Sequence, residues 1–312
     1  MTTLRQISRW VIVTSTKSSS IHHDTMKTIG ILLLAGFIVL SCGTNTKQTE
    51  QTKVFPYDLE NPSEKYIFKQ ELDEVSGLGW YKNNQIVAVN DEQGKVFVYD
   101  LEKKTVVEKF DFGMKGDYEG VEVVGDDIYV LESNGTLTAF KADLPETRVL
   151  DTGIPKKTEV EGLGYDAQTN RLLIAVKETE KKGKQVKDKI VYIFDLKQKS
   201  IWQGLVIPED ALNEAEKRFD LKTKEKAADC KLSGIAVHPQ TQDIYLIASD
   251  GKKLIVVNRQ GEISALITLD SQRFRQPEGI CFSPEGTLYI ASEGKGMGGG
   301  YMLKFDMKPI IQ

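Results

Sequence analysis

Apolar and polar residues follow one another in short runs through most of the chain, from about residue 65 onward. Runs such as "QIVAVND", "DIYVLES" and "TLYIASE" are rich in β-branched and aromatic residues, and Gly, Asn and Asp punctuate them. This pattern is typical of many short strands joined by tight turns. It predicts an all-β protein.

A glycine motif recurs five times along these runs, at Gly77, Gly120, Gly162, Gly234 and Gly279. The spacings between the glycines are 43, 42, 72 and 45 residues. Each motif is followed by a turn, a second strand and a third strand, and four of the repeats show a fourth. A repeat of about 42 residues with four strands is typical of a propeller blade. The sequence therefore predicts a five-bladed β-propeller.

The fifth repeat ends after its third strand. The segment "KYIFKQEL", from Lys65 to Leu72, stands just before the first motif, as the other fourth strands stand before later motifs. We expect it to complete the last blade, which would leave no exposed sheet edge. Residues 61–312 would then form a single propeller domain.

The long spacing of 72 residues comes from an insertion at residues 208–229 in the third repeat. Between Glu209 and Phe219 its apolar residues Ala211, Leu212 and Ala215 recur at helical spacing. A sixth blade is the alternative, but the segment lacks β-rich runs. We therefore predict a helical excursion over one rim.

The first strand of a propeller blade lines the central channel. The residue directly before each repeated glycine lies in such a strand. These residues, which should lie at the same depth, are Ser76, Glu119, Glu161, Ser233 and Glu278. Three carboxylates at close range repel one another unless they are protonated or neutralised by a cation. An all-oxygen set in a flexible ring favours Ca²⁺. The alternative is a solvent-filled channel in which the step only shapes a bend, with Gly for close packing.

A second tier of polar residues follows the second strands: Asn90, Asp91, Glu92, Glu132, Glu178, Asp250 and Glu293. We expect this tier near one end of the channel, where it would add metal ligands or bind a cationic or metal-bridged ligand. The alternative is a set of solvated turn residues. If the protein is an enzyme, Asp91 or Glu178 is the candidate general base.

The N-terminus has the features of an export signal. An apolar run of 12 residues from Ile29 to Leu40 follows Met26-Lys27, and it is too short to span a bilayer, which needs about 20 residues. The ending at Ser41-Cys42 resembles a bacterial lipobox. Residues 1–41 are thus a predicted signal peptide with an extension at 1–25, Cys42 the predicted lipidation site, and residues 42–60 a flexible tether. Since Gly43 follows the Cys, a Gram-negative host would send the protein to the outer membrane.

Charge and histidine content exclude several functions. The formal net charge is −4 and no basic block is present, which argues against nucleic acid as a partner. After removal of the signal the only histidine is His238, so neither a Ser-His-Asp triad nor a histidine-ligated zinc site is expected. We expect a monomer in the bacterial cell envelope, held by membrane lipid, with a small-molecule or envelope ligand that the sequence does not identify.

The five motifs "EVSGLGW", "DYEGVEVVGDDIYVLES", "EVEGLGYDAQTNRLLIAVKE", "KLSGIAVHPQTQDIYLIAS" and "QPEGICFSPEGTLYIASE" together resemble the SdiA-regulated, YjiK-like proteins. The resemblance extends from about Tyr66 to Phe305. It implies an exported or membrane-attached β-propeller without an established activity.

A more distant similarity is to calcium-activated nucleotidases (apyrases), five-bladed propellers with Ca²⁺ in the channel. Their calcium ring has the order Ser, Glu, Glu, Ser, Glu, which the residues before the five glycines reproduce here. This chain has Asp91-Glu92 where those enzymes have an Asp-Arg pair, and "ESNG" replaces their Gly-Lys-Glu-Trp stretch. The resemblance thus implies a shared metal site without the phosphate-handling cations.

Two functions remain. The favoured hypothesis is an envelope-anchored binding or scaffold propeller with Ca²⁺ in its channel, and the alternative is a Ca²⁺-dependent, nucleotidase-like phosphohydrolase. A phosphohydrolase needs Lys or Arg at the metal-bearing face. The candidates are Lys177, Lys252, Arg273, Arg275 and Lys295.

Overall fold

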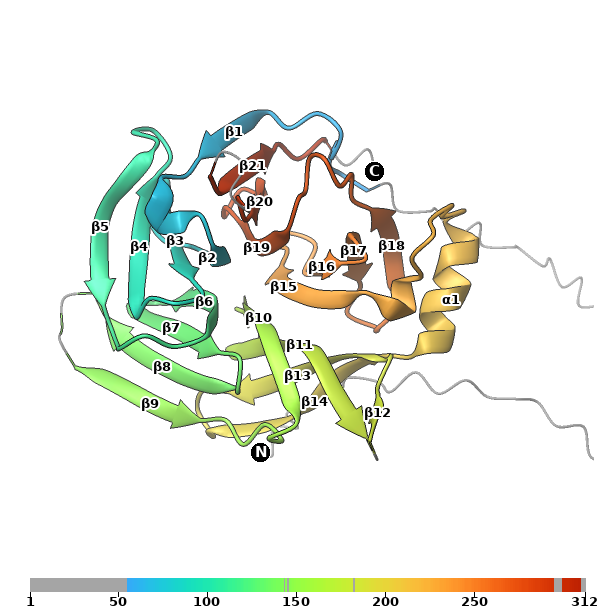
Figure 1. Cartoon of the computed structure of the whole chain (residues 1–312), viewed down its shortest axis with the longest axis horizontal. Coiled ribbons are helices and arrows are strands. Elements are labelled where there is room, and N and C mark those ends of the chain that lie inside the picture. Colours follow the sequence, from blue (N-terminus) through green and yellow to red (C-terminus); the bar gives the residue numbers. More distant parts are fainter. Residues whose placement is uncertain (1–54, 143, 145, 182, 295–298, 310–312) are drawn as a thin grey trace, which may run out of the picture. The chain divides into compact units, whose positions relative to one another are not determined.

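The computed structural model describes residues 55–142, 144, 146–181, 183–294 and 299–309, which all belong to one compact unit. Five antiparallel sheets surround a central axis (Figure 1). Each sheet has a path of four strands, so the predicted all-β, five-bladed propeller is confirmed. The described residues contain no sixth blade.

The strands of each blade follow one another along the chain. Blade 1 has β2 (Val75–Trp80), β3 (Gln85–Asn90), β4 (Lys95–Asp100) and β5 (Thr105–Asp111). Blade 2 has β6 (Tyr118–Val124), β7 (Asp127–Glu132), β8 (Thr136–Lys141) and β9 (Thr147–Asp151). Blade 3 has β10 (Thr158–Asp166), β11 (Arg171–Lys181), β13 (Lys189–Asp195) and β14 (Ser200–Ile207), with the short β12 (Lys184–Gln185) on β11. Blade 4 has β15 (Lys231–Val237), β16 (Ile244–Asp250), β17 (Lys253–Val257) and β18 (Ile263–Thr268).

Blade 5 combines the two ends of the propeller, as the sequence predicts. It contains β19 (Pro277–Phe282), β20 (Leu288–Ser292), β21 (Tyr301–Phe305) and the N-terminal β1 (Glu64–Ile67). Strand β1 pairs antiparallel with β21, with Tyr66 opposite Met302. The buried Tyr66 and Phe68 pack edge-to-face on Tyr99 of blade 1. The closing strand therefore also seals the boundary between blades 5 and 1.

The inner strands β2, β6, β10, β15 and β19 pack against one another in a closed ring. The repeated glycines allow this approach, because there is no room for a β-carbon. A Cβ on Gly77 would lie 2.8 Å from the Cα of Gly120, and one on Gly234 would lie 2.5 Å from the carbonyl oxygen of Glu278. The close-packing role of these glycines is thus confirmed. This packing role of the glycines does not explain the function of the residue that precedes each of them.

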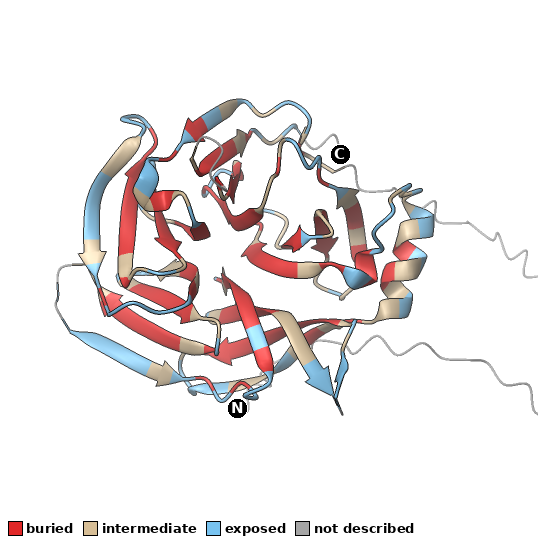
Figure 2. Cartoon of the chain, in the orientation of Figure 1, coloured by how far each residue is buried: buried red, intermediate tan, exposed pale blue. Residues whose placement is uncertain are grey.

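Apolar side chains fill the spaces between neighbouring blades. Figure 2 shows burial concentrated on the inner three strands of each blade, while the outer strands β5 and β9 are largely exposed. This gradient gives the inner strands a rigid setting, because their side chains are covered on both faces of the sheet.

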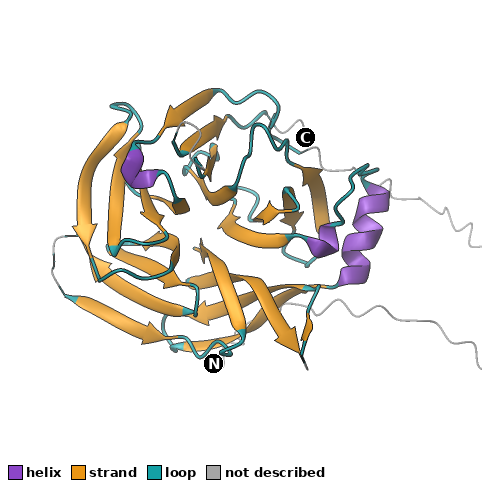
Figure 3. Ribbon diagram, in the orientation of Figure 1, coloured by secondary structure: helices purple, strands orange, loops and turns teal. Residues whose placement is uncertain are grey.

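The insertion forms the predicted helix (Figure 3). Helix α1 spans Glu209–Arg218 and a 3₁₀ turn, η2, spans Ala227–Asp229. Leu212 and Ala215 are buried, and Ala211 and Phe219 pack against the same apolar cluster between blades 3 and 4. The insertion is therefore an excursion from blade 3.

The described chain begins with a packed segment. Phe55, Tyr57 and Leu59 pack against the apolar cluster between blades 4 and 5. The Tyr57 hydroxyl donates to the carbonyl oxygen of Gly286 at 2.6 Å and lies 2.8 Å from Nε2 of the buried His238. The last part of the predicted tether is thus tied to the propeller, and the single histidine of the predicted mature chain serves this attachment.

The predicted signal peptide at 1–41 and the lipidation site at Cys42 lie outside the described residues. Within those residues, no helix is long and apolar enough to cross a membrane.

Candidate functional site

Each residue before a repeated glycine is an extra residue in a β-bulge. The register between the first and second strands skips one position at the motif in blades 1 to 4, and blade 5 is irregular at the same point. A bulge leaves its extra residue out of the ladder and redirects the side chain. The residues displaced in this way are Ser76, Glu119, Glu161, Ser233 and Glu278.

The bulges surround a narrow cavity between the inner strands. All five glycine motifs contribute to its lining, including the residues Ser76, Glu119, Ser233 and Glu278. The cavity volume is about 10 Å³. A space of this size holds about one water molecule or one monatomic ion.

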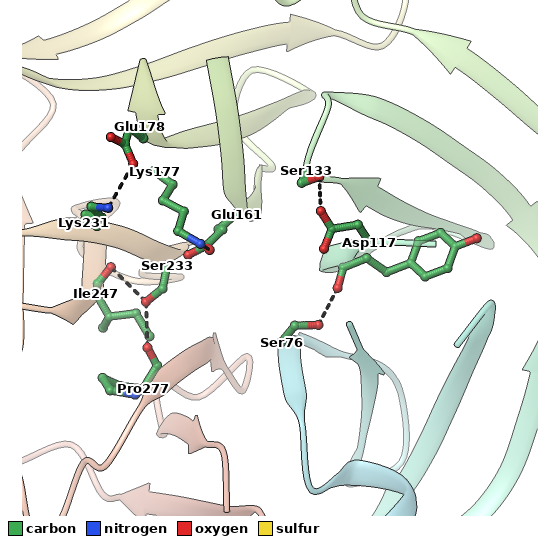
Figure 4. Close-up of polar contacts among 11 residues, drawn as sticks. Ser76, Asp117, Ser133, Glu161, Lys177, Glu178, Lys231, Ser233, Ile247 and Pro277 are labelled. Atoms are coloured by element: carbon green, nitrogen blue, oxygen red, sulfur yellow. Dashed lines mark hydrogen bonds and ion pairs between the residues drawn. The ribbon is translucent and has the colours of Figure 1, made fainter. Parts of the chain in front are cut away.

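The two serines connect neighbouring blades (Figure 4). Ser76 Oγ donates to the carbonyl oxygen of Tyr118 at 2.6 Å, and Ser233 Oγ donates to that of Pro277 at 2.6 Å. Each accepting residue directly precedes a ring glutamate. The serines therefore fix the positions of Glu119 and Glu278, while their hydroxyl oxygens keep lone pairs for a ligand.

Glu161 forms an ion pair that the sequence pattern does not predict. It is only 4% exposed, and its Oε1 pairs with Lys177 Nζ (Figure 4). Lys177 is itself an extra residue, because the register of β11 passes directly from Glu178 to Val176. Two bulges on adjacent strands thus direct Glu161 and Lys177 toward each other. The second oxygen of Glu161, Oε2, is buried and has no hydrogen-bond partner among the described residues.

The three ring carboxylates repel one another in a buried setting. Burial, and then the charges of Glu161 and Asp117, raise the pKa of Glu119 to about 8. Burial and the charge of Glu161 raise the pKa of Glu278 well above its usual range. Burial likewise raises the pKa of Glu161, although Lys177 opposes this. One ammonium group therefore does not neutralise the ring.

Lys177 is influenced by all three ring glutamates. Burial lowers its pKa, but the ion pair with Glu161 and the charges of Glu119 and Glu278 outweigh burial and raise it. The amine is thus protonated at neutral pH. Among the described residues that are candidates for phosphate handling, Lys177 therefore lies at the ring.

The other basic candidates have different surroundings. Lys252 donates to the carbonyl oxygen of Ser249. The backbone carbonyl oxygen of Arg273 accepts a hydrogen bond from the Tyr301 hydroxyl of blade 5 at 2.7 Å. The backbone N–H of Arg275 donates to the same hydroxyl at 3.2 Å. Lys295 lies outside the described residues.

Among the described residues, no group of three His, Cys, Asp or Glu side chains converges closely enough to hold a metal ion. Four lining residues, Ser76, Glu119, Ser233 and Glu278, nevertheless carry the hydroxyl and carboxylate oxygens that suit a hard cation. The lining also includes five apolar residues: Leu78, Val121, Leu163, Ile235 and Ile280. The unpartnered Oε2 of Glu161 is an unused oxygen donor.

The candidate bases of the second tier differ in their surroundings. Glu178 Oε2 lies 2.9 Å from Lys231 Nζ, and both side chains are about one-third exposed. Asp91 has one buried oxygen without a hydrogen-bond partner among the described residues, and burial, Glu74 and Glu92 raise its pKa. Glu178 is thus a partly exposed carboxylate that Lys231 neutralises, whereas Asp91 is an acid surrounded by like charges.

The remaining second-tier residues form no single site within the described ranges. The Asn90 amide donates to the carbonyl oxygen of Glu71 at 3.2 Å, which fixes a loop. Glu92 pairs with Lys115 at 3.7 Å on the surface. Glu132 accepts a hydrogen bond from Asn134 at 3.3 Å. In contrast, the charge of Asp250 acts on Glu161 and that of Glu293 on Glu278.

Comparison with known proteins gives one family and a fold. The model of the SdiA-regulated family matches residues 63–295. No curated protein matches the chain. The similar solved structures include a glutaminyl cyclase from Myxococcus xanthus, with a TM-score of 0.55 and 11% identity over 80% of this chain and 96% of that one. A luciferin-regenerating enzyme has a TM-score of 0.47 and 10% identity over 81% and 94% of the two chains. At such identities the likeness concerns the fold alone, and the resemblance to calcium-activated nucleotidases stays a prediction from the sequence.

Proposed function

The chain belongs to the SdiA-regulated family, and from that premise we propose that it is an envelope lipoprotein whose propeller binds Ca²⁺ at the carboxylate ring. The anchor would be acylated Cys42, and the ring would serve as a ligand-binding or scaffold module. The observation that carries the proposal is the ring itself, in which bulges place three glutamates around the channel, Glu161 pairs with Lys177, and the charges of Glu119 and Glu278 also act on that lysine.

The charge balance favours a divalent cation. Glu119, Glu161 and Glu278 would carry three negative charges when ionised, and Lys177 supplies one positive charge. Burial is the main cause of the raised pKa values of the three acids, and for Glu119 and Glu278 the charges of neighbouring ring acids add to it. A bound divalent cation favours ionised carboxylates and would offset the surplus negative charge. Ca²⁺ takes roughly six to eight oxygen ligands in flexible geometry, which suits donors spread over five blades.

The residues that would hold the ion are the five predicted ones. Glu119, Glu161 and Glu278 supply charge, and the hydroxyls of Ser76 and Ser233 are positioned beside them by their bonds to the next blade. When bound, Ca²⁺ supplies a positive pole that attracts anionic groups of a ligand.

The arrangement gives less support to the alternative phosphohydrolase. A general base needs a free carboxylate near the reacting water, and Glu178 is instead paired with Lys231. Asp91 lies among like charges from Glu74, Glu92 and Asp117, a setting that repels a phosphate. A ligand-binding role therefore fits better.

Calorimetric titration of the full chain with Ca²⁺, after treatment with a chelator, tests the proposal. We expect saturable binding of about one ion per chain and a higher melting temperature with Ca²⁺ than with chelator. Glu161→Gln should weaken binding by about tenfold or more, because a charged donor is lost. The matched control is Glu108→Gln, an exposed residue on the outer strand β5. No heat of binding together with an unchanged melt would disprove a calcium site.

A further inference from the structure

The placement of Lys177 depends on an irregularity that blades 1 and 2 lack. In blades 1 and 2 the second strand pairs without an extra residue opposite the motif. In blade 3 the extra residue is Lys177, and in blade 4 the corresponding place is taken by Ser249. A charged side chain has thus been directed into the ring by a bulge that the blade fold does not require.

The ion pair is also incomplete. Lys177 satisfies Oε1 of Glu161 and leaves Oε2 buried without a hydrogen-bond partner among the described residues. An unmade hydrogen bond on a buried carboxylate is costly. The pairing with Lys177 therefore leaves one buried oxygen of Glu161 available to another cation.

Lys177 has a route out of the ring. Its side chain is 31% exposed, and a lysine stem is long and flexible. Two acids whose charges act on Glu161, Asp250 and Glu159, are both exposed and could receive the displaced amine at the rim. The adjacent Lys231 is already paired with Glu178, so its charge at the rim is compensated.

We propose that Lys177 is an internal counter-ion of the ring, which occupies Glu161 in the metal-free protein and moves out when a divalent cation binds. This inference rests on the proposed function, because it concerns the same site. An ammonium group and a divalent cation that both bind the carboxylate of Glu161 repel each other strongly at contact distance. Lys177 therefore sets how tightly the ring binds its metal.

Titration of the full chain with Ca²⁺ alone, in the wild type and in Lys177→Met, is the test. Methionine keeps much of the stem and removes the charge, so the variant should bind Ca²⁺ about tenfold or more tightly than the wild type. The matched control is Lys231→Met, which removes the same charge from a neighbouring amine held by Glu178. We expect less than about a threefold change there, since exposed charges interact weakly.

A second measurement follows the amine itself. Acetylation of surface lysines, quantified by mass spectrometry, should modify Lys177 faster with Ca²⁺ than with chelator. The labelling of Lys231 should change little. This readout uses the wild type, so it does not depend on the folding of any variant, and Lys177→Gln provides a second neutral replacement for the titration.

The outcomes separate this inference from the proposed function. If the wild type and Lys177→Met bind Ca²⁺ equally tightly, or if Ca²⁺ does not change the labelling rate of Lys177, then the counter-ion role of Lys177 is wrong. The proposed calcium site would not be affected by either result. Binding by Lys177→Met alone would support the counter-ion and remove the native calcium site. If neither protein binds Ca²⁺, both proposals are wrong.

Discussion

Glu119 shows how the ring and the stability of the propeller are connected. Its side chain approaches the axis from a bulge, and burial among like charges raises its pKa to about 8. In the unfolded chain the same carboxyl has its ordinary pKa of about 4.5. Folding therefore takes up a proton between these two values, and the metal-free ring is most stable when this residue is neutral.

The consequence is a stability that falls with rising pH in the absence of metal. Below about pH 4.5 Glu119 is protonated in both states, and above about pH 8 it is ionised in both. Between them only the folded chain holds the proton, so the free energy of unfolding should decrease as pH rises from 5 to 8. A folded-state pKa that lies one pH unit above the unfolded-state pKa corresponds to about 1.4 kcal/mol. Because Glu119 is partly solvated, we expect the loss of free energy of unfolding to be smaller than this relation gives for its pKa difference.

Melting curves recorded in chelator at pH values from 5 to 8 measure this effect. Glu119→Gln should make the decline shallower, because the amide cannot ionise, while Glu161 and Glu278, whose pKa values are also raised, still can. Saturating Ca²⁺ should flatten the decline as well, if the ion favours the carboxylate form. A melting temperature that increases over this pH range in chelator would contradict the assignment of buried, mutually repelling acids.

Each inner strand combines two requirements in adjacent residues. The glycine lets the strand approach the next blade, and the bulge before it releases one side chain toward the axis. At Gly234 the approach is closest among the five repeated glycines, with Glu278 O at 2.5 Å and Cγ1 of Ile247 at 2.9 Å from a built Cβ. The same contact positions Glu278, so packing and site are coupled at this strand.

Gly234→Ala should therefore destabilise the fold by about 3 kcal/mol, at the upper end of the cost of overpacking a core. The control is Gly125→Ala, where a Cβ meets nothing within 4 Å but the backbone has a φ of +63°. That change should cost only about 1 kcal/mol of left-handed strain. Urea denaturation measures both. Equal costs would mean that the contact between blades 4 and 5 is looser than the structure shows.

The sequence was sufficient for the repeat, since glycine spacing and strand patterns report the blade directly. It also singled out the five residues that lie at the bulges, because each of them directly precedes a repeated glycine. It did not place Lys177, since nothing in "RLLIAVKETE" marks an extra residue opposite Glu161. A second bulge depends on packing in three dimensions. The attachment of Tyr57 was missed for a similar reason, as its partners lie 181 and 229 residues away.

At the scale of the whole molecule, the propeller is a ring closed by one short strand. Strand β1 supplies Tyr66 to the boundary with blade 1 and covers the outer edge of β21. Without it β21 would be an exposed edge of apolar residues, a template for aggregation. Because each blade packs on two neighbours, opening one boundary frees both ends of the ring. The inner strands, and with them the carboxylates, would lose their common setting.

A chain that begins at Lys69 tests this directly, against a control that begins at Val54. The control retains β1 and the packed segment around Tyr57, and it should give one cooperative melt and a monomeric elution on gel filtration. The shortened chain loses the burial of Tyr57, Tyr66 and Phe68, worth about 2 kcal/mol each, as well as the pairing with β21. It should aggregate or melt without cooperativity. A synthetic peptide of residues 55–68 added during refolding should restore the fold by taking the place of the missing strand. A shortened chain that stays monomeric and melts like the control would show that the propeller does not need its closing strand.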